Sequence, residues 1–412
     1  MSNHLIPPPT AASMVERPSG PLVGVRIIEV THAAAGPFAA LMLADMGADV
    51  IKVEPPGGEM ARGVGPFHPA DQVHAYGGRY AYRNRNKRSI VLDLTTEADR
   101  EVFLELVDTA DGLIENMRAG VLDRLGVGWD ACRARNPRLV YAAIRGFGDP
   151  RTGASPYVDW PAYDAIAQAM GGLVATTGPD SEHPMRVGPI VGDLIPGLQA
   201  ALGLVSALHH ALRSGQGQFL DVAMVDGLMT MCETPQILWA YRGKDYEPSG
   251  NAVEDVAPFN VYVTKDGGRL AIAAPMPGQW RALCAAMGRP DLGEDPALTS
   301  IAGRAAQMER VDAAVAEWIA SCTQAEVLER LGGVVPVGPV HKASAWADEP
   351  HVAARQMLVA VEHEHHPPTT QLACPIKFTE TPAGVHRSPP LLDQHGEELR
   401  AEAAARRSDG AG

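Results

Sequence analysis

The sequence predicts an α/β protein, with a doubly wound domain on a parallel sheet followed by a smaller α+β domain. The first observation is a regular alternation of short, β-branched apolar runs with helical stretches, which is typical of a parallel sheet covered by helices. The second is a change of pattern after about residue 246, where two alternating runs flank a strong turn signal. The third is an ordinary globular composition over 412 residues, with 46% hydrophobic and 20% charged residues, which suits two domains.

The alternation begins with a compact βαβ unit. Gly24–Val30 is apolar and β-branched, as in a buried strand, and Ala48–Val53 is a second run of the same kind. Between them Phe38–Met46 has helical character, and Pro37 suits the first turn of a helix, where its missing N–H costs nothing. Such a unit requires parallel strands joined by a right-handed crossover.

The same alternation continues to about residue 230. Thr96 is placed to cap one helix, and the turn Ser214–Gly217 ends the longest one. Ligands of a doubly wound sheet bind at the carboxyl ends of its strands, so residues just after each strand are the first candidates for a site. The further predicted elements are strands at Ser89–Leu94, Gly112–Glu115, Leu139–Ile144 and Phe219–Met224, and helices at Thr96–Thr109 and about Pro196–Arg213.

The chain divides into four parts. Residues 1–20 are proline-rich and are expected to form a loose arm, and residues 21–230 form the large α/β domain. Residues 247–350 form the small α+β domain, and residues 351–412 have too few apolar side chains for a core of their own, so we expect them to pack back on the large domain. The small domain is predicted to hold a hairpin of Phe259–Val263 and Arg269–Ala273 around Lys265–Gly268, and helices near Pro277–Ala286, Ala302–Ser321 and Gln324–Leu331.

Composition limits the partners and the compartment. The 35 Lys and Arg residues are outnumbered by 49 Asp and Glu residues, giving a net charge of −14, so no nucleic-acid partner is expected. The five cysteines are scattered without a CxxC pair, and the N-terminus lacks the apolar core of a signal peptide, which together favour the cytoplasm. Leu194–Leu212 has no formal charge but contains Gln199, His209 and His210, so we expect a buried core helix and no membrane contact.

Several well-known motifs are missing. The turn Val30–Gly36 lacks GxGxxG, and the chain has no GxxxxGK[ST], GxSxG or HExxH. His363–His366 resembles a metal cluster, but Pro367 and Pro368 follow directly, which favours a solvated loop without a metal.

Asp193 is the most informative residue, because it lies just before the long apolar helix. Its simplest interpretation is an N-cap, in which the carboxylate accepts N–H groups of the first turn. The same position would keep the carboxylate ionised through the helix dipole and the amides. Such a carboxylate can act as a nucleophile, and with an acyl donor it forms an anhydride.

Other polar residues have both a structural and a functional interpretation. Asp164 could cap a helix, and Tyr163 could be a core aromatic or a hydroxyl donor to a bound acid. His32 follows the first strand, where either a loop histidine or a site residue fits. The basic run Arg83–Arg88 is interpreted as a solvated surface, with phosphate binding as the alternative. Asn116 and Arg118 follow a strand and could meet a ligand, and Arg124 could pair with Asp123 or reach a phosphate.

An ordered set of segments carries a family resemblance. The segments are Gly24–Glu29, Gly36-Pro37, Leu43–Glu54, Asn86–Ser89 with Leu92-Asp93, Glu115–Arg118, Leu122–Arg124, Gly146–Gly148, Tyr163–Gly172, Gly192-Asp193 and Gly215–Gln218. Together they resemble the class III CoA-transferases, the family of formyl-CoA transferase and carnitine CoA-transferase, which also includes the α-methylacyl-CoA racemases. Each motif alone is weak, but the ordered set is specific.

The resemblance implies a Rossmann-like large domain built from both chain ends, a smaller domain between them, and an interlocked homodimer. It implies coenzyme A or an acyl-CoA as substrate and no permanently bound cofactor. Asp193 matches the catalytic aspartate of the transferases, which forms an aspartyl anhydride and then an aspartyl-CoA thioester. The matching CoA positions are His32, Ala34 and Ala35 near the thioester and Leu92, Asp93, Asn116, Met117, Arg118 and Arg124 along the cofactor, while Tyr163 and Asp164 match the acyl site.

The chain departs from parts of the family pattern. The racemases carry a His-Asp pair where this chain has Tyr163-Asp164, and tyrosine with its pKa of about 10 is a poor base. Their later glutamate has no counterpart in Ala273–Pro277. Val64 stands where the formyl-CoA enzyme has a tryptophan, and Pro55 replaces an expected CoA-binding arginine. We therefore expect a CoA-transferase for an acid larger than formate, with an acyl-CoA racemase or epimerase, or a non-catalytic CoA-binding protein, as alternatives.

Overall fold

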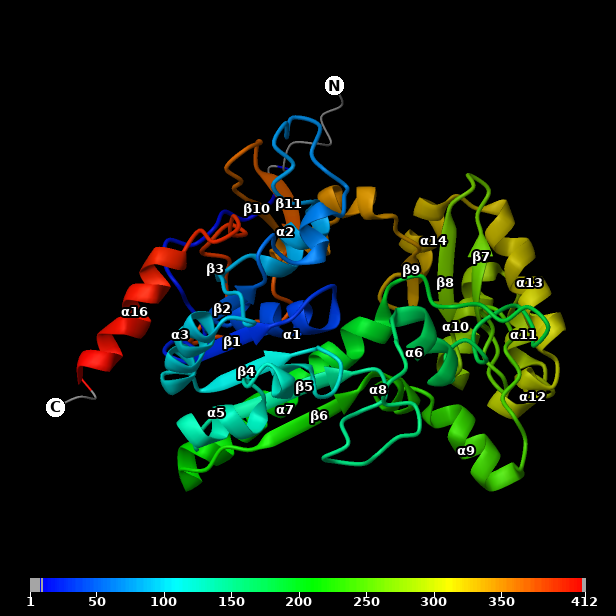
Figure 1. The fold of residues 1–412 in the computed structure, drawn as a ribbon. Helices are drawn as coiled ribbons and strands as arrows, with labels where there is room; N and C mark the ends of the chain where they lie inside the picture. Colours follow the sequence, from blue (N-terminus) through cyan, green and yellow to red (C-terminus); the bar gives the residue numbers. More distant parts are fainter. Residues whose placement is uncertain (1–7, 9, 410–412) are drawn as a thin grey trace. The chain divides into compact units, whose positions relative to one another are not determined.

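The computed structural model describes residue 8 and residues 10–409, which form two compact units. Unit 1 holds the described residues up to Leu173, Val187–Glu233 and those from Ala347 onward. Unit 2 holds Val174–Arg186 and Thr234–Trp346. Unit 1 therefore joins elements from both ends of the chain, which carry the blue and red ends of the colour scale in Figure 1.

Unit 1 is built on a six-stranded sheet in which every pairing is parallel, in the order β3-β2-β1-β4-β5-β6. This sheet confirms the predicted α/β class. The chain leaves β1 first toward β2 and later toward β4, so the crevice between β1 and β4 is the point at which such sheets bind ligands. The strands are β1 (Arg26–Val30), β2 (Asp49–Glu54), β3 (Lys87–Val91), β4 (Gly112–Glu115), β5 (Val140–Arg145) and β6 (Phe219–Ala223).

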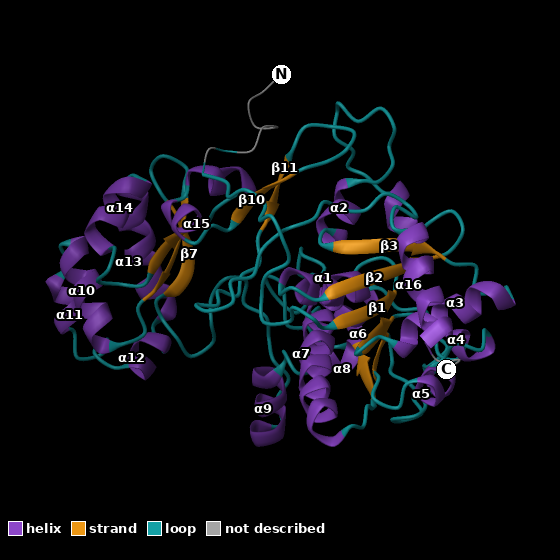
Figure 2. Ribbon diagram, turned by 90° about the vertical axis from the view of Figure 1, so that its left-hand side faces the viewer, coloured by secondary structure: helices purple, strands orange, loops and turns teal. Residues whose placement is uncertain are grey.

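Helices cover both faces of this sheet, because successive strand residues point to opposite sides. Ile27 packs in the core under α1 (Ala35–Asp45) and α7 (Val191–Ser214). The next residue, Ile28, packs in the opposite core with α3 (Glu97–Asp108), α5 (Trp129–Arg135) and α16 (Gly396–Asp409). Figure 2 shows these layers around β1 to β3. The remaining helices of unit 1 are η2 (Met60–Gly63), α2 (Gly78–Asn84), α4 (Val121–Arg124), α6 (Asp164–Met170), α8 (Met224–Met229) and α15 (Pro350–Ala354).

Helix α7 is the predicted core helix, but it starts earlier than expected. It begins at Val191, so Pro196 lies inside it and not at its start. Among the described residues, α7 alone is long and apolar enough to span a membrane. Its inner face packs against α1, and a side chain at Gly197 would meet the carbonyl oxygen of Ala35 at 2.8 Å. The close helix contact therefore requires glycine at this position.

The cations of the basic run Arg83–Arg88, apart from Arg83, form neither a solvated surface nor a phosphate site. Arg85, Lys87 and Arg88 are all buried, and Arg85 pairs with Asp45 at 2.6 Å. Lys87 pairs with a buried glutamate, and Arg88 pairs with carboxylates of β2 and α16. These cations stabilise the sheet and its C-terminal helix, so both sequence interpretations of this segment were wrong.

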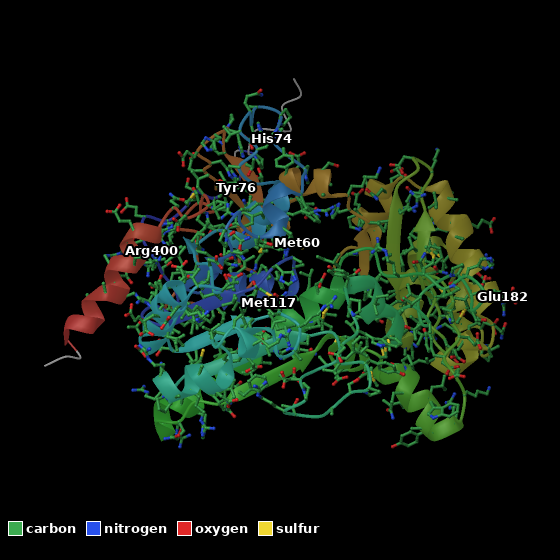
Figure 3. All side chains as sticks on the ribbon, viewed as in Figure 1. Met60, His74, Tyr76, Met117, Glu182 and Arg400 are labelled. Carbon is green, nitrogen blue, oxygen red and sulfur yellow. The ribbon has the colours of Figure 1, made fainter. Side chains whose placement is uncertain are left out.

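The C-terminal segment returns to unit 1. Arg400 on α16, labelled in Figure 3, donates to Asp99 of α3 at 2.8 Å. The hairpin of β10 (Leu358–Val361) and β11 (Thr369–Leu372) pairs with the described part of the N-terminal arm, through Ala12. Between these strands His363 and His366 lie in a loop, as predicted, but the loop is not solvated as expected, because their rings are partly buried and stacked at 4.1 Å. Within residues 8 and 10–409, no cluster of metal-ligating side chains is present.

Unit 2 is a three-stranded antiparallel sheet, β7-β8-β9, backed by helices around one apolar core. The predicted hairpin matches β7 (Phe259–Val263) and β8 (Arg269–Ala273) residue for residue. The predicted helix Ala302–Ser321 is two helices, because the backbone breaks at Gln307 between them. Strand β9 (Val337–Pro339) was not predicted, since three residues are too few for a visible alternation. The helices are α9 (Glu233–Arg242), whose residues from Thr234 on belong to this unit, α10 (Pro277–Met287), α11 (Pro290–Glu294), α12 (Ile301–Ala305), α13 (Met308–Ser321) and α14 (Gln324–Leu331); η3 (Ala343–Asp348) ends the unit at Trp346.

Candidate active site

A pocket of about 330 Å³ opens at the carboxyl ends of β1, β4 and β5. It lies at the switch point of the sheet, where the topology predicts a ligand. His32–Ala35 line it after β1, Asn116–Ala119 after β4, and Arg145 at the end of β5, while Tyr163 and Asp193 complete the wall. The polar groups therefore come from segments that are far apart in the sequence.

A second pocket of about 330 Å³ adjoins the first and shares His32, Met117 and Val121 with it. Its remaining wall is largely apolar, with Asp93 as one of few charged residues. Met60 and Met117, both labelled in Figure 3, line this second pocket. The two pockets together suit an elongated ligand with a polar reactive end and an apolar stretch.

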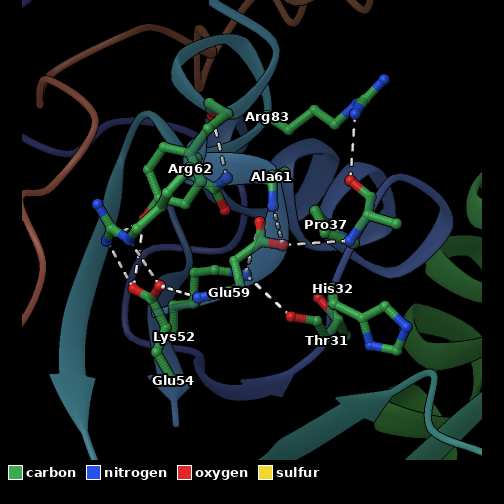
Figure 4. A network of polar contacts seen from close by, with 12 residues as sticks. Thr31, His32, Pro37, Lys52, Glu54, Glu59, Ala61, Arg62 and Arg83 are labelled. Atoms are coloured by element: carbon green, nitrogen blue, oxygen red, sulfur yellow. Dashed lines mark hydrogen bonds and ion pairs between the residues drawn. The ribbon is translucent and has the colours of Figure 1, made fainter. Parts of the chain in front are cut away.

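Three side chains hold the loop that separates β1 from α1. Asn116 accepts from the backbone N–H of His32 and donates to its carbonyl oxygen, both at 2.9 Å. Glu59 accepts from the N–H of Ala33 at 3.2 Å, and Arg83 donates to the carbonyl oxygen of Ala33 at 3.1 Å, as Figure 4 shows. Ala33 has a φ of 63°, a left-handed conformation that costs a non-glycine residue about 1–2 kcal/mol. The four hydrogen-bonded backbone groups hold this strained loop in place.

A buried network of charged side chains holds Glu59 in position. Lys52 on β2 is fully buried and lies 3.0 Å from Glu29 and 3.8 Å from Glu59. Burial lowers the pKa of Lys52, but the facing carboxylates of Glu29, Glu59 and Glu54 raise it more, so the ammonium stays charged. Glu54 also pairs with Arg62 at 2.6 Å, the second half of the network in Figure 4. The loop is therefore fixed to the rigid sheet.

The sequence places Asp193 just before the long helix. In the structure it lies within the first turn of α7. Ile190 is the N-cap, and no side chain caps it. Among the described residues, no group donates a hydrogen bond to the Asp193 carboxylate, although it lines the pocket. Its pKa is raised from the ordinary 3.8 to about 6, mainly by burial and also by the nearby charge of Asp164, while Arg83 acts in the opposite direction. The expected hydrogen bonds from the helix amides to this carboxylate are absent among the described residues, so the amides do not lower its pKa, although a group with a pKa of about 6 is still mainly ionised at pH 7.

Asp164 takes the capping role that the sequence assigned to Asp193. It is the first residue of α6, whose N-cap is Tyr163, so it does not cap its own helix as expected. Its carboxylate accepts from the backbone N–H of Gly192 at 2.9 Å and from the side chain of Gln168 at 2.9 Å. Asp164 thus satisfies the N-terminus of α7 from a neighbouring helix and leaves the Asp193 carboxylate facing the pocket.

His32 and the start of α1 form the remaining polar wall. Burial lowers the pKa of His32, while Glu59 raises it and Lys52 lowers it, so the imidazole is neutral at pH 7. Helix α1 begins at Ala35 without a side-chain cap, and Ala34 and Ala35 line the pocket. The uncapped amides and the helix dipole favour negative charge at this wall.

The structure brings together most of the site residues predicted from the sequence. Tyr163 lies at the rim with 60% of its surface exposed. Arg124 is exposed and Asp164 lies behind Asp193, and neither lines a pocket described above. The residues in the first pocket are His32, Ala34, Ala35, Asn116, Met117, Arg118, Tyr163 and Asp193, and those in the second are His32, Leu92, Asp93 and Met117.

Glu59 and Arg83 were not predicted as site residues. Glu59 follows β2 closely, so its place after a strand was a usable signal. Arg83 was masked by the basic run, since its neighbours are buried structural cations. Only the tertiary structure shows that Arg83 contacts the active-site loop, whereas the other cations of the run are buried in the fold.

A parallel sheet in this order, with an adjoining pair of pockets at its switch point and an aspartate of raised pKa in one of them, defines an α/β enzyme that binds a nucleotide-containing or similarly elongated ligand. The chain belongs to CoA-transferase family III, which it matches over residues 22–396. The resemblance seen in the sequence is thereby confirmed.

Relatives match over nearly the whole chain. The succinyl-CoA:mesaconate CoA-transferase of Haloarcula hispanica is 40% identical over 385 residues, covering 93% of this chain and 96% of that protein. The succinyl-CoA–D-citramalate CoA-transferase of Chloroflexus aurantiacus is 36% identical, covering 93% of this chain and 94% of that protein. A crystal structure of a CAIB/BAIF family protein from Brucella suis has a TM-score of 0.81 and 31% identity, covering 93% of this chain and 100% of that one.

Proposed function

We propose that this protein transfers coenzyme A from an acyl-CoA to a free carboxylic acid, with Asp193 as the nucleophile. The observation that carries the proposal is the Asp193 carboxylate, which faces the pocket with a pKa of about 6. A carboxylate of this pKa is still mainly ionised at pH 7 and is more basic than an ordinary aspartate. Both properties favour nucleophilic attack on a thioester.

The proposed reaction balances without water, metal or redox chemistry. An Asp193 oxygen attacks the thioester carbon, the C–S bond breaks, and CoA leaves as a thiolate, which gives a mixed anhydride. The thiolate then attacks the aspartyl carbon, releases the donor acid as a carboxylate and forms an aspartyl-CoA thioester. The acceptor carboxylate then attacks the aspartyl-CoA thioester, which releases the CoA thiolate and gives a second mixed anhydride. The thiolate attacks the acceptor's acyl carbon in this anhydride, so the new acyl-CoA leaves and the Asp193 carboxylate is restored.

The pocket geometry supports this assignment. The thiolate and the tetrahedral oxyanions carry negative charge, which the uncapped start of α1 at Ala34 and Ala35 stabilises. CoA is proposed to extend along the apolar second pocket, past Leu92 and Asp93, and Asn116 holds the His32 loop against it. CoA acts here as a substrate, and we propose no permanently bound cofactor.

The acid is proposed to be larger than formate. Val64 is a smaller side chain than the tryptophan of the formyl-CoA enzyme and leaves room. The relatives named above act, by their names, on succinyl-CoA with mesaconate or D-citramalate. An acyl-CoA racemase is less well supported, since the exposed Tyr163 replaces a histidine base.

Mass spectrometry of the peptide that contains Asp193 tests the proposal. The protein is incubated with a panel of acyl-CoAs and quenched with hydroxylamine or borohydride, with Asp193→Ala as the control. A donor-dependent product on Asp193 is expected. α-Proton exchange in deuterated buffer without any adduct would indicate a racemase instead, and CoA binding with neither signal would indicate a non-catalytic protein.

We propose a homodimer, interlocked as in the resemblance, in the cytoplasm. The outer face of α7 supports a partner, because Leu202 is 69% exposed and Leu212 is 71% exposed. Helix α9 has no buried residue, and Trp239 and Tyr241 are exposed on it. The five free cysteines suit a reducing compartment. Light scattering of the wild type and of Leu202→Glu tests the dimer, which the charged side chain should weaken.

A further inference from the structure

Helix α2 places two arginines one turn apart beside the active-site loop. Arg79 is exposed and Arg83 is half-buried, and within the described residues neither has a carboxylate within ion-pair distance. This is unusual in a chain with a net charge of −14, where the other cations of the same run are fully paired. Like charges at this spacing destabilise a helix by about 0.2–0.5 kcal/mol. The repulsion between Arg79 and Arg83 therefore destabilises α2 slightly, and a bound anion would reduce this repulsion.

Arg83 is tied to the site by contact and by charge. Its Nη1 donates to the carbonyl oxygen of Ala33, which lines the pocket (Figure 4). Burial lowers the pKa of Arg83, and the largest opposing effect is that of the Asp193 carboxylate. A guanidinium has five N–H donors, so one bond to Ala33 leaves four available. Arg83 thus has unfilled donors beside the loop that lines the pocket, and its charge acts on the reacting carboxylate.

We propose that Arg83 binds the second carboxylate of a dicarboxylic substrate, so that the site selects dicarboxylic acids and their mono-CoA thioesters. One carboxyl group reacts at Asp193, and the other pairs with the guanidinium of Arg83. Guanidinium matches a carboxylate with two parallel hydrogen bonds, which fixes the orientation of the acid as well as its charge. A monocarboxylic acid of equal length leaves the half-buried cation unpaired and binds less well. This inference rests on the proposed function and names its substrate class.

The test compares acids of equal length in the transfer assay, using the donor identified by labelling of Asp193. Succinate is compared with butyrate, and glutarate with valerate, as acceptors for wild type, Arg83→Gln and Arg79→Gln. Glutamine removes the charge and, because its amide ends two bonds short of Nη1, also the hydrogen bond to Ala33. Loss of that bond affects both kinds of acid, so the difference between dicarboxylates and monocarboxylates isolates anion binding. Arg79→Gln makes the same charge change one turn away and serves as the matched control.

We expect Arg83→Gln to lower kcat/KM for the dicarboxylates about 10- to 100-fold more than for the monocarboxylates, because only the former lose a charge-assisted pair. Arg79→Gln should leave both within about twofold, as exposed charges contribute little. Equal loss for both kinds of acid would show that Arg83 only positions the loop and would overturn the proposal. A wild type that uses butyrate as well as succinate would also overturn it while leaving CoA transfer intact. If no acid is a substrate and no Asp193 adduct forms, the proposed function fails and this inference fails with it.

Discussion

Replacing Asp193 by asparagine should make the protein more stable at neutral and alkaline pH. The folded protein holds the Asp193 pKa at about 6, above its ordinary value of 3.8, so burial disfavours the charged form. A group of this kind destabilises the fold fully above the folded pKa, and the cost fades as pH falls from about 6 to 3.8. The amide has no charge, so the variant avoids this cost.

The magnitude follows from the two pKa values. The difference between about 6 and 3.8, at 1.36 kcal/mol for each unit, corresponds to about 3 kcal/mol at pH 8. About half of that remains at pH 5, since the carboxyl group is then mainly protonated in the fold but still mainly ionised in the unfolded chain. The value is an upper one, because asparagine keeps part of the desolvation cost of a polar group.

Urea unfolding at pH 8, 7, 6 and 5, at one protein concentration, measures the effect. Asp226→Asn is the matched control, because Asp226 lies in the first turn of α8 but is exposed. The stability gain of Asp193→Asn should shrink between pH 8 and pH 5 by about 1.4 kcal/mol, whereas the control should show no such trend. A gain that is absent at pH 8, or that stays constant down to pH 5, would refute the burial account of the Asp193 pKa. Such a gain with loss of transfer activity would mark Asp193 as a residue kept at the expense of stability.

Three further predictions concern the site and its support. The kcat/KM for CoA transfer should fall as pH drops through about 6, because protonated Asp193 is not a nucleophile. In Asp164→Asn the inflection should move to lower pH, because the charge of Asp164 raises the pKa of Asp193. A profile of kcat/KM that is flat down to pH 5 would contradict this prediction. Asn116→Ala removes both hydrogen bonds to the backbone of His32, so we expect kcat/KM to fall at least about tenfold and stability by about 1–3 kcal/mol, measured by steady-state kinetics and urea unfolding. Lys52→Met leaves buried carboxylates facing an uncharged side chain and should cost about 3 kcal/mol in urea unfolding, and an unchanged midpoint would show that the network contributes nothing net.

The alternation of apolar runs and turn signals was enough to predict the sheet. The predicted strands Gly112–Glu115, Phe259–Val263 and Arg269–Ala273 coincide with the observed ones, because their patterns are local. The break within the predicted helix Ala302–Ser321 lies at Gln307, where no glycine or proline announces it. Strand β9 forms only because β8 offers it a partner.

Local interpretation failed where the partner of a charge lies far away in the sequence. Lys87 pairs with Glu29, and Arg88 reaches Glu402 near the end of the chain. No residue next to the basic run in the sequence indicates these partners. The local pattern therefore favoured the interpretation that the run is a solvated surface. Burial of the run follows from the sheet order, which places β3 beside β2 and under the C-terminal helix.

The sequence by itself determined the α/β class, the family and the residue types that can carry the chemistry, because these depend on local patterns and on an ordered set of motifs. Only the tertiary structure decided which carboxylate is available. Asp193 and Asp164 both looked like helix caps, but the packing of α6 against α7 gives the cap to Asp164 and leaves Asp193 facing the pocket with a raised pKa. The physical reason is that burial and neighbouring charge, which set a pKa, are properties of the packed fold and not of the residues next to it in the chain.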